Sequence, residues 1–253
     1  MRNIRSYQLQ FWLVHLALPI VLALFLVLIY PRTGLDALLI SPFYDTKILS
    51  FPLKGDWFLE NIMHQCLKYL MVGISLMMLG LWVLGLKIWA SGVAKLENLL
   101  GLNHSFNPKN SLIQIYHRQF LWVFVAMLIA STAISILKHF SVHACPWSLL
   151  LYGGTQPLIP LFGHLPSGAE PGHCFPGGHA SGGFALIAFY FAFRDTEPKL
   201  AKVGLLAGMV FGFAMGWAQM MRGAHFMSHN LWTAWIVWII LLVLYLIWPP
   251  KKQ

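Results

Sequence analysis

Residues 119–137 read QFLWVFVAMLIASTAISIL, an apolar run without a charged side chain that ends at Lys138. About 20 apolar residues are enough for a helix to cross the hydrocarbon core of a bilayer. Five more runs of this kind occur in the chain, so we expect six membrane-spanning helices. The expected spans are residues 11–30, 62–89, 119–137, 179–194, 201–221 and 230–248.

The composition supports this interpretation. Of the 253 residues, 58% are hydrophobic and only 10% are charged, and the mean hydropathy is +0.67. These values exclude a soluble globular domain. We expect an all-α polytopic membrane protein in which residues 1–253 form a single integral membrane domain. The first span is too long, and too plainly followed by others, to be a cleaved signal peptide.

Lysine and arginine indicate the orientation, because they are enriched in cytoplasmic connections. With six spans, most of them fall on the side of both termini, which we expect to be cytoplasmic. Residues 31–61, 138–178 and 222–229 would then face the periplasm of a bacterial inner membrane. The net charge of +9 reflects this topology and attraction to anionic lipids, and no nucleic-acid partner is expected. The basic residues on the cytoplasmic side are Arg2, Arg5, Lys87, Lys95, Lys109, Arg118, Arg194, Lys199, Lys202, Lys251 and Lys252.

Polar residues gather at the external ends of the later spans. In Pro176-Gly177-Gly178-His179, two glycines precede an expected helix whose free N–H groups would point at an anion such as phosphate. His179 could donate a proton to a leaving oxygen. Taken alone, the motif is also compatible with a glycine-rich turn that carries an incidental histidine.

A second polar group follows residues 201–221. His225 and His229 are four residues apart and would share a helix face. His225 is a candidate nucleophile if His229 fixes its tautomer; a buried histidine pair and a zinc pair are the alternatives. Arg222, one helical turn earlier, could donate two parallel hydrogen bonds to phosphate oxygens, and Lys138 offers a second cation. Snorkelling at a span end is the alternative for either cation.

One span also carries an architectural pattern. Gly204, Gly208, Gly212 and Gly216 recur every four residues. Such a stripe lets a neighbouring helix backbone approach closely within the membrane. We expect it to hold Arg222 at the external end of a tightly packed helix.

These residues resemble the motifs of the type 2 phosphatidic acid phosphatase superfamily. They occur in the same order along the chain and are expected on the same side of the membrane. Those motifs are K-x6-R-P, P-S-G-H and S-R-x5-H-x3-D, and the resemblance covers the last four spans. It implies a helical catalytic core at about 119–248 with its active site at the external rim, and a phosphatase that needs no metal and no cofactor. It further implies that His225 attacks phosphorus to form a phosphohistidine and that His179 protonates the leaving group. The matching positions are Lys138, Pro146, Pro176, Gly178, His179 and His225.

Several motif positions differ from the family pattern. Cys145 replaces the arginine of the first motif, and Gly177 replaces the serine of the second but keeps a backbone N–H that could hold phosphate beside Gly178. Ala218-Gln219 stands where the third motif has Ser-Arg. Arg222 lies nearly on the same helix face as residue 219. We expect it to bind phosphate in place of the arginine of the third motif.

The replacement of the motif aspartate by His229 is the most consequential difference. A neutral His229 can accept the ring N–H of His225, but it supplies no negative charge to the imidazolium. Glu170 is the only acidic residue in 139–178, and we expect it to supply the missing carboxylate. His143, near the first motif, could help to bind phosphate, although loop histidines commonly contact only water.

The cysteines suggest a covalent link. Cys145 and Cys174 both lie in the external segment, where the oxidising periplasm permits a disulfide. Such a bond would join the first and second motifs and contribute about 3–4 kcal/mol on the chain-entropy model. Unpaired thiols and a metal site are the alternatives. Cys66, inside a span, is expected to be a small buried hydrophobe.

The leading functional prediction is a phosphatase that acts on a lipid phosphate or diphosphate. Candidate substrates are isoprenoid diphosphate, phosphatidylglycerol phosphate, phosphatidic acid and the phosphates of lipid A; transfer to another lipid would use the same residues. One alternative is a metal-binding membrane protein that uses His225, His229, His143 and the external cysteines. Another is a non-catalytic relative that binds a lipid phosphate. No function is assigned to His15, His64, His104 and His117.

Overall fold

The computed structural model describes residues 7–86 and 112–250. Across these residues the chain is helical and contains no β-strand, only isolated bridges at Asp45–Ser50 and Leu149–Gln156. Five of its helices are long and apolar enough to cross a membrane, so the chain is a multi-pass membrane protein. These helices are Leu9–Arg32, Phe58–Leu84, Leu112–His139, Pro198–Met221 and Met227–Ile247.

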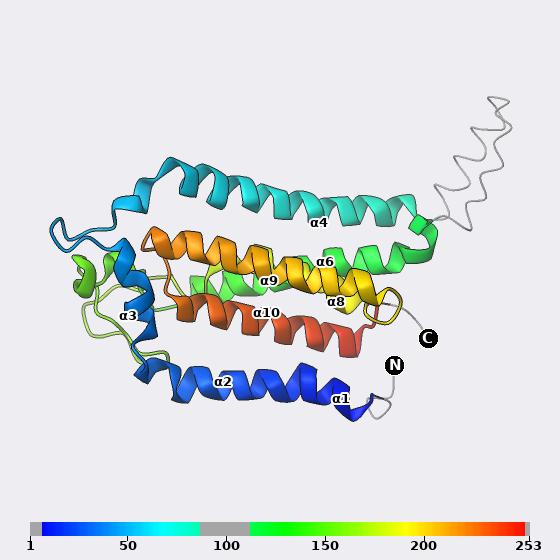
Figure 1. The fold of residues 1–253 in the computed structure, drawn as a ribbon, viewed down its shortest axis with the longest axis horizontal. Coiled ribbons are helices and arrows are strands. Elements are labelled where there is room, and N and C mark those ends of the chain that lie inside the picture. The colour runs from blue at the N-terminus through cyan, green and yellow to red at the C-terminus, as the bar shows by residue number, and fades with distance from the viewer. Residues whose placement is uncertain (1–6, 87–111, 251–253) are drawn as a thin grey trace, which may run out of the picture.

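Figure 1 shows the long helices packed side by side as a bundle, with α3 across one end. The first span combines α1, a π-helical turn and α2, and the second combines a π-helix with α4. The bounds are α1 (Leu9–Trp12), π-helix Leu13–Ala17, α2 (Leu18–Leu28), α3 (Leu35–Ile40), π-helix Phe58–Cys66, α4 (Leu67–Leu84), α6 (Leu112–His139), α7 (Gly178–Phe184), α8 (Ala188–Phe193), α9 (Pro198–Met221) and α10 (Met227–Ile247).

The expectation of six full-length spans is met only in part. The segment expected at 179–194 is an apolar helical run over Gly178–Phe193, which is shorter than the other spans. At 1.5 Å per residue this run is roughly 24 Å long, less than the roughly 30 Å of a bilayer core. The connection at 87–111, with Lys87, Lys95, Lys109 and His104, lies outside the described residues. The basic residues at positions 2, 5, 251 and 252 do as well.

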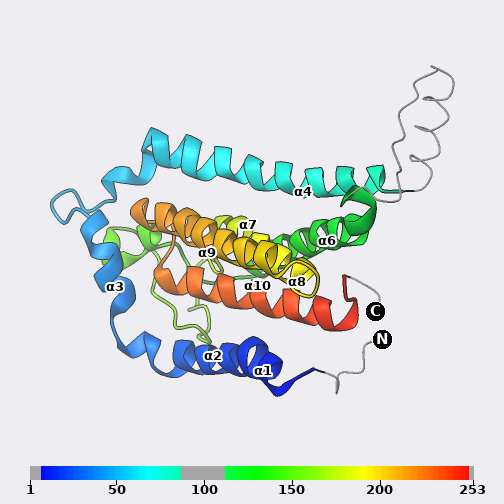
Figure 2. The same ribbon diagram turned by 45° about the vertical axis from the view of Figure 1, so that its right-hand side comes forward.

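The glycine stripe brings α9 against the helical run of α7 and α8 (Figure 2). A Cβ atom on Gly183 of α7 would lie 2.4 Å from the backbone N of Gly212 in α9. Cβ atoms on Gly208 and Gly204 would meet Ile187 and Phe189 at 2.6 and 2.5 Å. The expected close backbone approach is therefore confirmed. It fixes α7, which begins with the second motif, on the helix that leads to the third.

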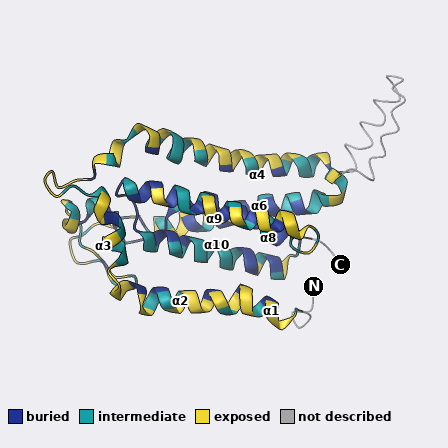
Figure 3. Cartoon of the chain, in the orientation of Figure 1, coloured by how far each residue is buried: buried dark blue, intermediate teal, exposed yellow. Residues whose placement is uncertain are grey.

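Burial divides the bundle into a core and a lipid-facing surface. In Figure 3, exposed positions recur along α2 and α4, whereas α9 and α10 have extensive buried faces. The largest fully buried side chains include Trp122, Phe184, Phe191 and Tyr245. A separate apolar cluster lies among α3 and the loops at the motif-bearing end of the bundle. It consists of Ile40, Phe51, Ala144, Leu149 and Phe226.

Candidate active site

Lys138 lies against the start of α7. It occupies the last turn of α6, and α7 begins at Gly178, directly after Pro176 and Gly177. A Cβ atom on Gly178 would be 3.5 Å from Cδ of Lys138 and 3.7 Å from its Nζ. The first and second motifs therefore meet at the N-terminus of α7, where no side chain caps the helix.

The backbone N–H of Gly177 is already used within the protein. It donates to Oγ1 of Thr233 at 2.8 Å, and the Thr233 hydroxyl in turn donates to the carbonyl of His229 at 2.7 Å. The expectation that this N–H holds phosphate is therefore corrected, because Thr233 takes it up to join α7 to α10. Gly178, one residue later, keeps the predicted position at the helix start.

The loop that carries His225 begins with a tight helix end. Gly223 has a φ of +74°, and its N–H and that of Ala224 donate to Met220 and Gln219 at 2.9 and 2.8 Å. These two bonds form a Schellman motif, which ends a helix on a left-handed residue. His225 thus lies in the loop between α9 and α10. The four-residue spacing had predicted a continuous helix over His225 and His229, and that expectation is corrected.

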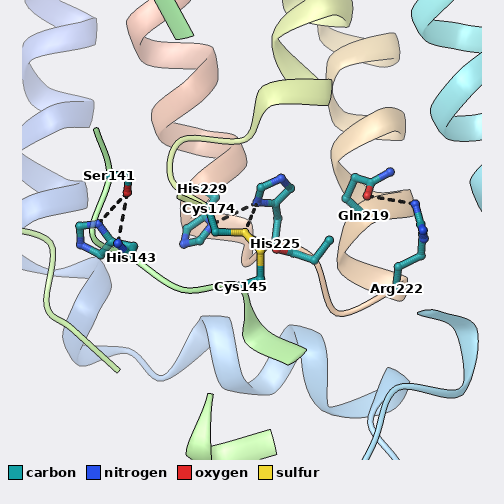
Figure 4. Close-up of a disulfide and its surroundings, with 9 residues drawn as sticks. Ser141, His143, Cys145, Cys174, Gln219, Arg222, His225 and His229 are labelled. Carbon is teal, nitrogen blue, oxygen red and sulfur yellow. Dashed lines mark hydrogen bonds between the residues drawn. A yellow bond between two sulfur atoms is a disulfide. The ribbon is translucent and has the colours of Figure 1, made fainter. Parts of the chain in front are cut away.

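His225 and His229 nevertheless face each other. Their Nδ1 atoms are 3.2 Å apart, and the two side chains are only 3% and 5% exposed. Figure 4 shows the paired rings next to the disulfide. Because one Nδ1 must donate to the other, a proton on Nδ1 of His225 leaves a lone pair on its Nε2. His229 can thereby select the tautomer that suits a nucleophile.

The surroundings of His225 keep its ring neutral. Burial lowers the pKa of His225 well below its ordinary value of 6.5, and the nearby charges of His229, Lys138 and His179 lower it further. A hydrogen bond to the backbone of Cys174 acts in the opposite direction. The charges of Lys138 and His179, from the first and second motifs, thus help to keep this imidazole of the third motif neutral.

Arg222 does not point to this histidine pair. Its Nη2 lies 2.9 Å from Oε2 of Glu60, and its Nε donates to the carbonyl of Lys54 at 3.0 Å. In Figure 4 it lies beside Gln219, apart from His225. The expectation that Arg222 replaces the motif arginine is corrected, because the turn at Gly223 ends α9 and the guanidinium is held by protein groups.

The expected supporting residues lie elsewhere as well. Glu170 is exposed and, within the described ranges, forms no hydrogen bond or ion pair with His225 or His229. The two ring nitrogens of His143 form hydrogen bonds within the loop. Nδ1 lies 3.2 Å from Oγ of Ser141, and Nε2 lies 3.2 Å from the carbonyl oxygen of Pro160. It lines a cavity of about 410 Å³ that also contacts His229 but not Lys138.

Cys145 and Cys174 form a disulfide, with Cα atoms 5.2 Å apart. Sγ of Cys174 is 3.0 Å from the carbonyl oxygen of Ala224 and 3.8 Å from Nδ1 of His225. The bond therefore joins the first and second motif segments and packs directly on the third. Cys66 is exposed on the helix surface, which corrects the expectation that it is buried.

A cavity of about 750 Å³ opens between α4, α6 and α7. Lys138, Gly178 and His179 line its polar end, whereas His225 and His229 do not line it. The wall also includes Lys68, which the sequence analysis had not assigned to the site. His139 and His173 line it as well; like His143, these loop histidines could be expected either to help bind phosphate or to contact only water. Toward the middle of the bundle the lining becomes mainly apolar. It consists there of Val72, Leu76, Phe124, Met127 and Leu128, together with Ser75 and Ser131.

His64 is a neighbour of His179 that sequence reasoning missed. The two ring centroids are 3.6 Å apart at an interplanar angle of 41°, and Nδ1 of His64 is buried without a hydrogen-bond partner. The pattern Glu60-x3-His64-x3-Lys68 was the available signal. Ionisable residues at helical spacing inside an apolar span commonly mark a functional site.

The described residues do not support the metal-site alternative. Both external cysteines are used in the disulfide, so neither is a thiolate ligand. Over residues 7–86 and 112–250 no group of three or more His, Cys, Asp or Glu side chains is arranged to hold a metal ion.

Comparison with known families adds one finding to this geometry. Residues 119–253, slightly more than half of the chain, match the family described as the PAP2 superfamily. Comparisons with curated proteins and with solved structures gave no match. The matched region begins within α6 and includes Lys138, His179 and His225.

Proposed function

The chain belongs to the PAP2 superfamily, and from this membership we propose that it is a metal-independent phosphatase of a membrane lipid phosphate or diphosphate. One observation carries the proposal more than any other. His225 pairs with His229 at 3.2 Å, and Lys138 lies against the start of α7, the helix that carries His179. A nucleophile, an orienting base, a cation and a proton donor are thus grouped at one end of the bundle.

In the first chemical step, Nε2 of His225 attacks phosphorus and the bond from phosphorus to the lipid oxygen breaks. His179 gives a proton to that oxygen. Lys138 and the free N–H groups at the start of α7 balance the charge on the phosphoryl oxygens. His229 holds the Nδ1 proton of His225, so the ring stays oriented as it acquires positive charge.

In the second step, water attacks the phosphohistidine. His179, now neutral, accepts a proton from the water. The phosphorus–nitrogen bond breaks, inorganic phosphate leaves, and His225 returns to its neutral form. A lipid hydroxyl in place of water would make the same site a phosphotransferase.

The shape of the cavity favours a lipid substrate. Its polar end has Lys138 and His179, and its remaining length between α4 and α6 is mainly apolar. A molecule with a phosphate at one end and a hydrocarbon chain at the other matches this division. Isoprenoid diphosphate, phosphatidylglycerol phosphate, phosphatidic acid and lipid A phosphates all fit that description.

The membrane orientation is part of the proposal. Lysine and arginine favour cytoplasmic termini in a bacterial inner membrane, and Figure 1 supports a common side because α1 begins and α10 ends at the same end of the bundle. The site would then face the periplasm, where a disulfide such as Cys145–Cys174 persists. We propose that the whole chain forms one integral membrane domain.

The test is phosphate release by the purified full-length protein from a panel of the four lipid phosphates, with a chelator present. We expect release from at least one substrate, loss of turnover in His225→Ala, and unchanged turnover in His164→Ala, a loop histidine outside the site. Equal rates for wild type and His225→Ala would remove the assignment. Tight binding of a lipid phosphate without any release would favour the non-catalytic alternative.

A further inference from the structure

A polar face of the second span reaches the site, although this span precedes the family-matched region at 119–253. Glu60, His64 and Lys68 follow each other at intervals of four residues, which places them on one side of a helix. Glu60 binds Arg222, His64 packs on His179, and Lys68 lines the cavity beside Lys138 and His179.

The motif residues leave the phosphate site short of positive charge. The two arginine positions of the family pattern are Cys145, which is in a disulfide, and Gln219, which is neutral. The charge of Arg222 is taken up by Glu60. Lys138 is therefore the one cation that the motifs bring to this cavity, whereas a phosphate monoester carries a charge of about −1.5 to −2 at pH 7.

Lys68 has the charge and the position to fill this gap. It is exposed on the apolar surface of the span, and in the described part of the chain it forms no ion pair; its Nζ contacts only the ring of Tyr69, at 5.7 Å from the centroid. An unpaired charge inside a membrane span is costly, and such residues normally find a partner or mark a substrate path. An anion in the cavity would be that partner.

We propose that Lys68 is the second phosphate-binding cation of the site and, with Lys138, holds the phosphoryl group between the α4 and α6 walls. The inference rests on the proposed lipid phosphatase function and deepens it. The flexible four-carbon stem of lysine suits this task, since the ammonium can follow the phosphate from entry to reaction. The headgroup is thus recognised from both sides of the opening through which the lipid chain enters.

The test compares Lys68→Met, Lys68→Arg and the control Lys47→Met, an exposed lysine of the loop that precedes the second span. Two quantities are measured on the full-length protein: KM for the lipid phosphate that is cleaved, and the concentration of inorganic phosphate that gives half-maximal inhibition. We expect Lys68→Met to raise both by about 10- to 100-fold, as for the loss of a hydrogen bond between charged groups. Lys68→Arg should stay close to wild type, and Lys47→Met should be unchanged.

Wild-type values for Lys68→Met would overturn the role of Lys68 and leave the phosphatase intact. A wild-type protein that releases no phosphate from any lipid would instead overturn the proposed function. Thermal unfolding with and without inorganic phosphate then still tests Lys68 by itself. Stabilisation by phosphate in wild type but not in Lys68→Met supports an anion site at Lys68, and equal stabilisation of both contradicts it.

Discussion

Nη2 of Arg222 lies 2.9 Å from Oε2 of Glu60, and this ion pair ties the second span to the end of α9. The guanidinium is almost buried, whereas the carboxylate is half exposed. Removing either partner leaves the other poorly compensated. The pair therefore connects a helix outside the family-matched region to the loop that carries His225.

We expect Glu60→Gln and Arg222→Met each to lower the free energy of unfolding by about 1–3 kcal/mol, because each leaves a charged group without its partner. The double variant should be less destabilised than the sum of the two, with a coupling energy of about 0.5–3 kcal/mol. Denaturation in detergent measures all three, with the exposed Arg32→Met as control. Additive effects would show that the pair is not coupled.

His229 should determine the turnover number through the tautomer of His225. His229→Phe removes the acceptor at 3.2 Å, and we expect kcat to fall by about 100-fold or more, as when the orienting member of a catalytic triad is lost. His229→Asp restores an acceptor that also carries negative charge, and it should keep kcat within about tenfold of wild type. Equal losses in both variants would mean that the pair serves packing alone.

Stability should fall as the pH drops below 6.5, and His225 should account for part of the slope. Its pKa is lowered by burial, so above pH 6.5 the ring is neutral in both the folded and the unfolded chain. Below that pH the unfolded chain takes up a proton that the folded chain does not, which costs up to about 1.4 kcal/mol per pH unit. Unfolding of wild type and His225→Asn between pH 7 and 5 should give a smaller slope for the variant; identical slopes would contradict the lowered pKa.

Reduction of the disulfide should weaken both stability and catalysis. The bond closes a loop with a sequence separation of 29, for which the chain-entropy model gives about 3–4 kcal/mol. Because Sγ of Cys174 lies 3.8 Å from Nδ1 of His225, we also expect a lower kcat in Cys145→Ser. Intact mass after alkylation without reductant reports the bond, and Cys66→Ser is the matched control. Two alkylated external thiols in the native protein would show that the bond is absent.

His64 should act as a positioning residue for His179. The ring contact at 3.6 Å restricts the orientation of the proposed acid, and small displacements of a reacting group can slow a reaction greatly. We expect His64→Ala to lower kcat about tenfold with little change in inhibition by inorganic phosphate, and His64→Phe to recover most of the loss. An effect on phosphate inhibition alone would place His64 in binding instead.

Hydropathy and motif order predicted most of the architecture. The run at 201–221 is the helix Pro198–Met221, and the run at 230–248 is Met227–Ile247, because length and polarity alone decide whether a segment suits a bilayer. The glycine stripe likewise predicted a close helix contact, since only the absence of a side chain permits it. These are properties of single segments, which a sequence displays directly.

Several of the errors concern contacts between distant segments. Spacing correctly placed Arg222 beside Gln219, but the expected phosphate-binding role was wrong, because the guanidinium meets Glu60, 162 positions away. The N–H of Gly177 meets Thr233 at a separation of 56, and His64 meets His179 from another span. Such pairings depend on how helices pack, and no local pattern in the chain specifies them.

The bond between Gly177 and Thr233 also fixes the depth of the reaction. Thr233 lies well inside α10, which begins at Met227, so the start of α7 is roughly 9 Å below the end of its neighbour at 1.5 Å per residue. If the proposed external end of α10 lies at the level of the lipid headgroups, the lipid must be drawn inward before cleavage. Lipids that are easily displaced from their neighbours should then be dephosphorylated fastest.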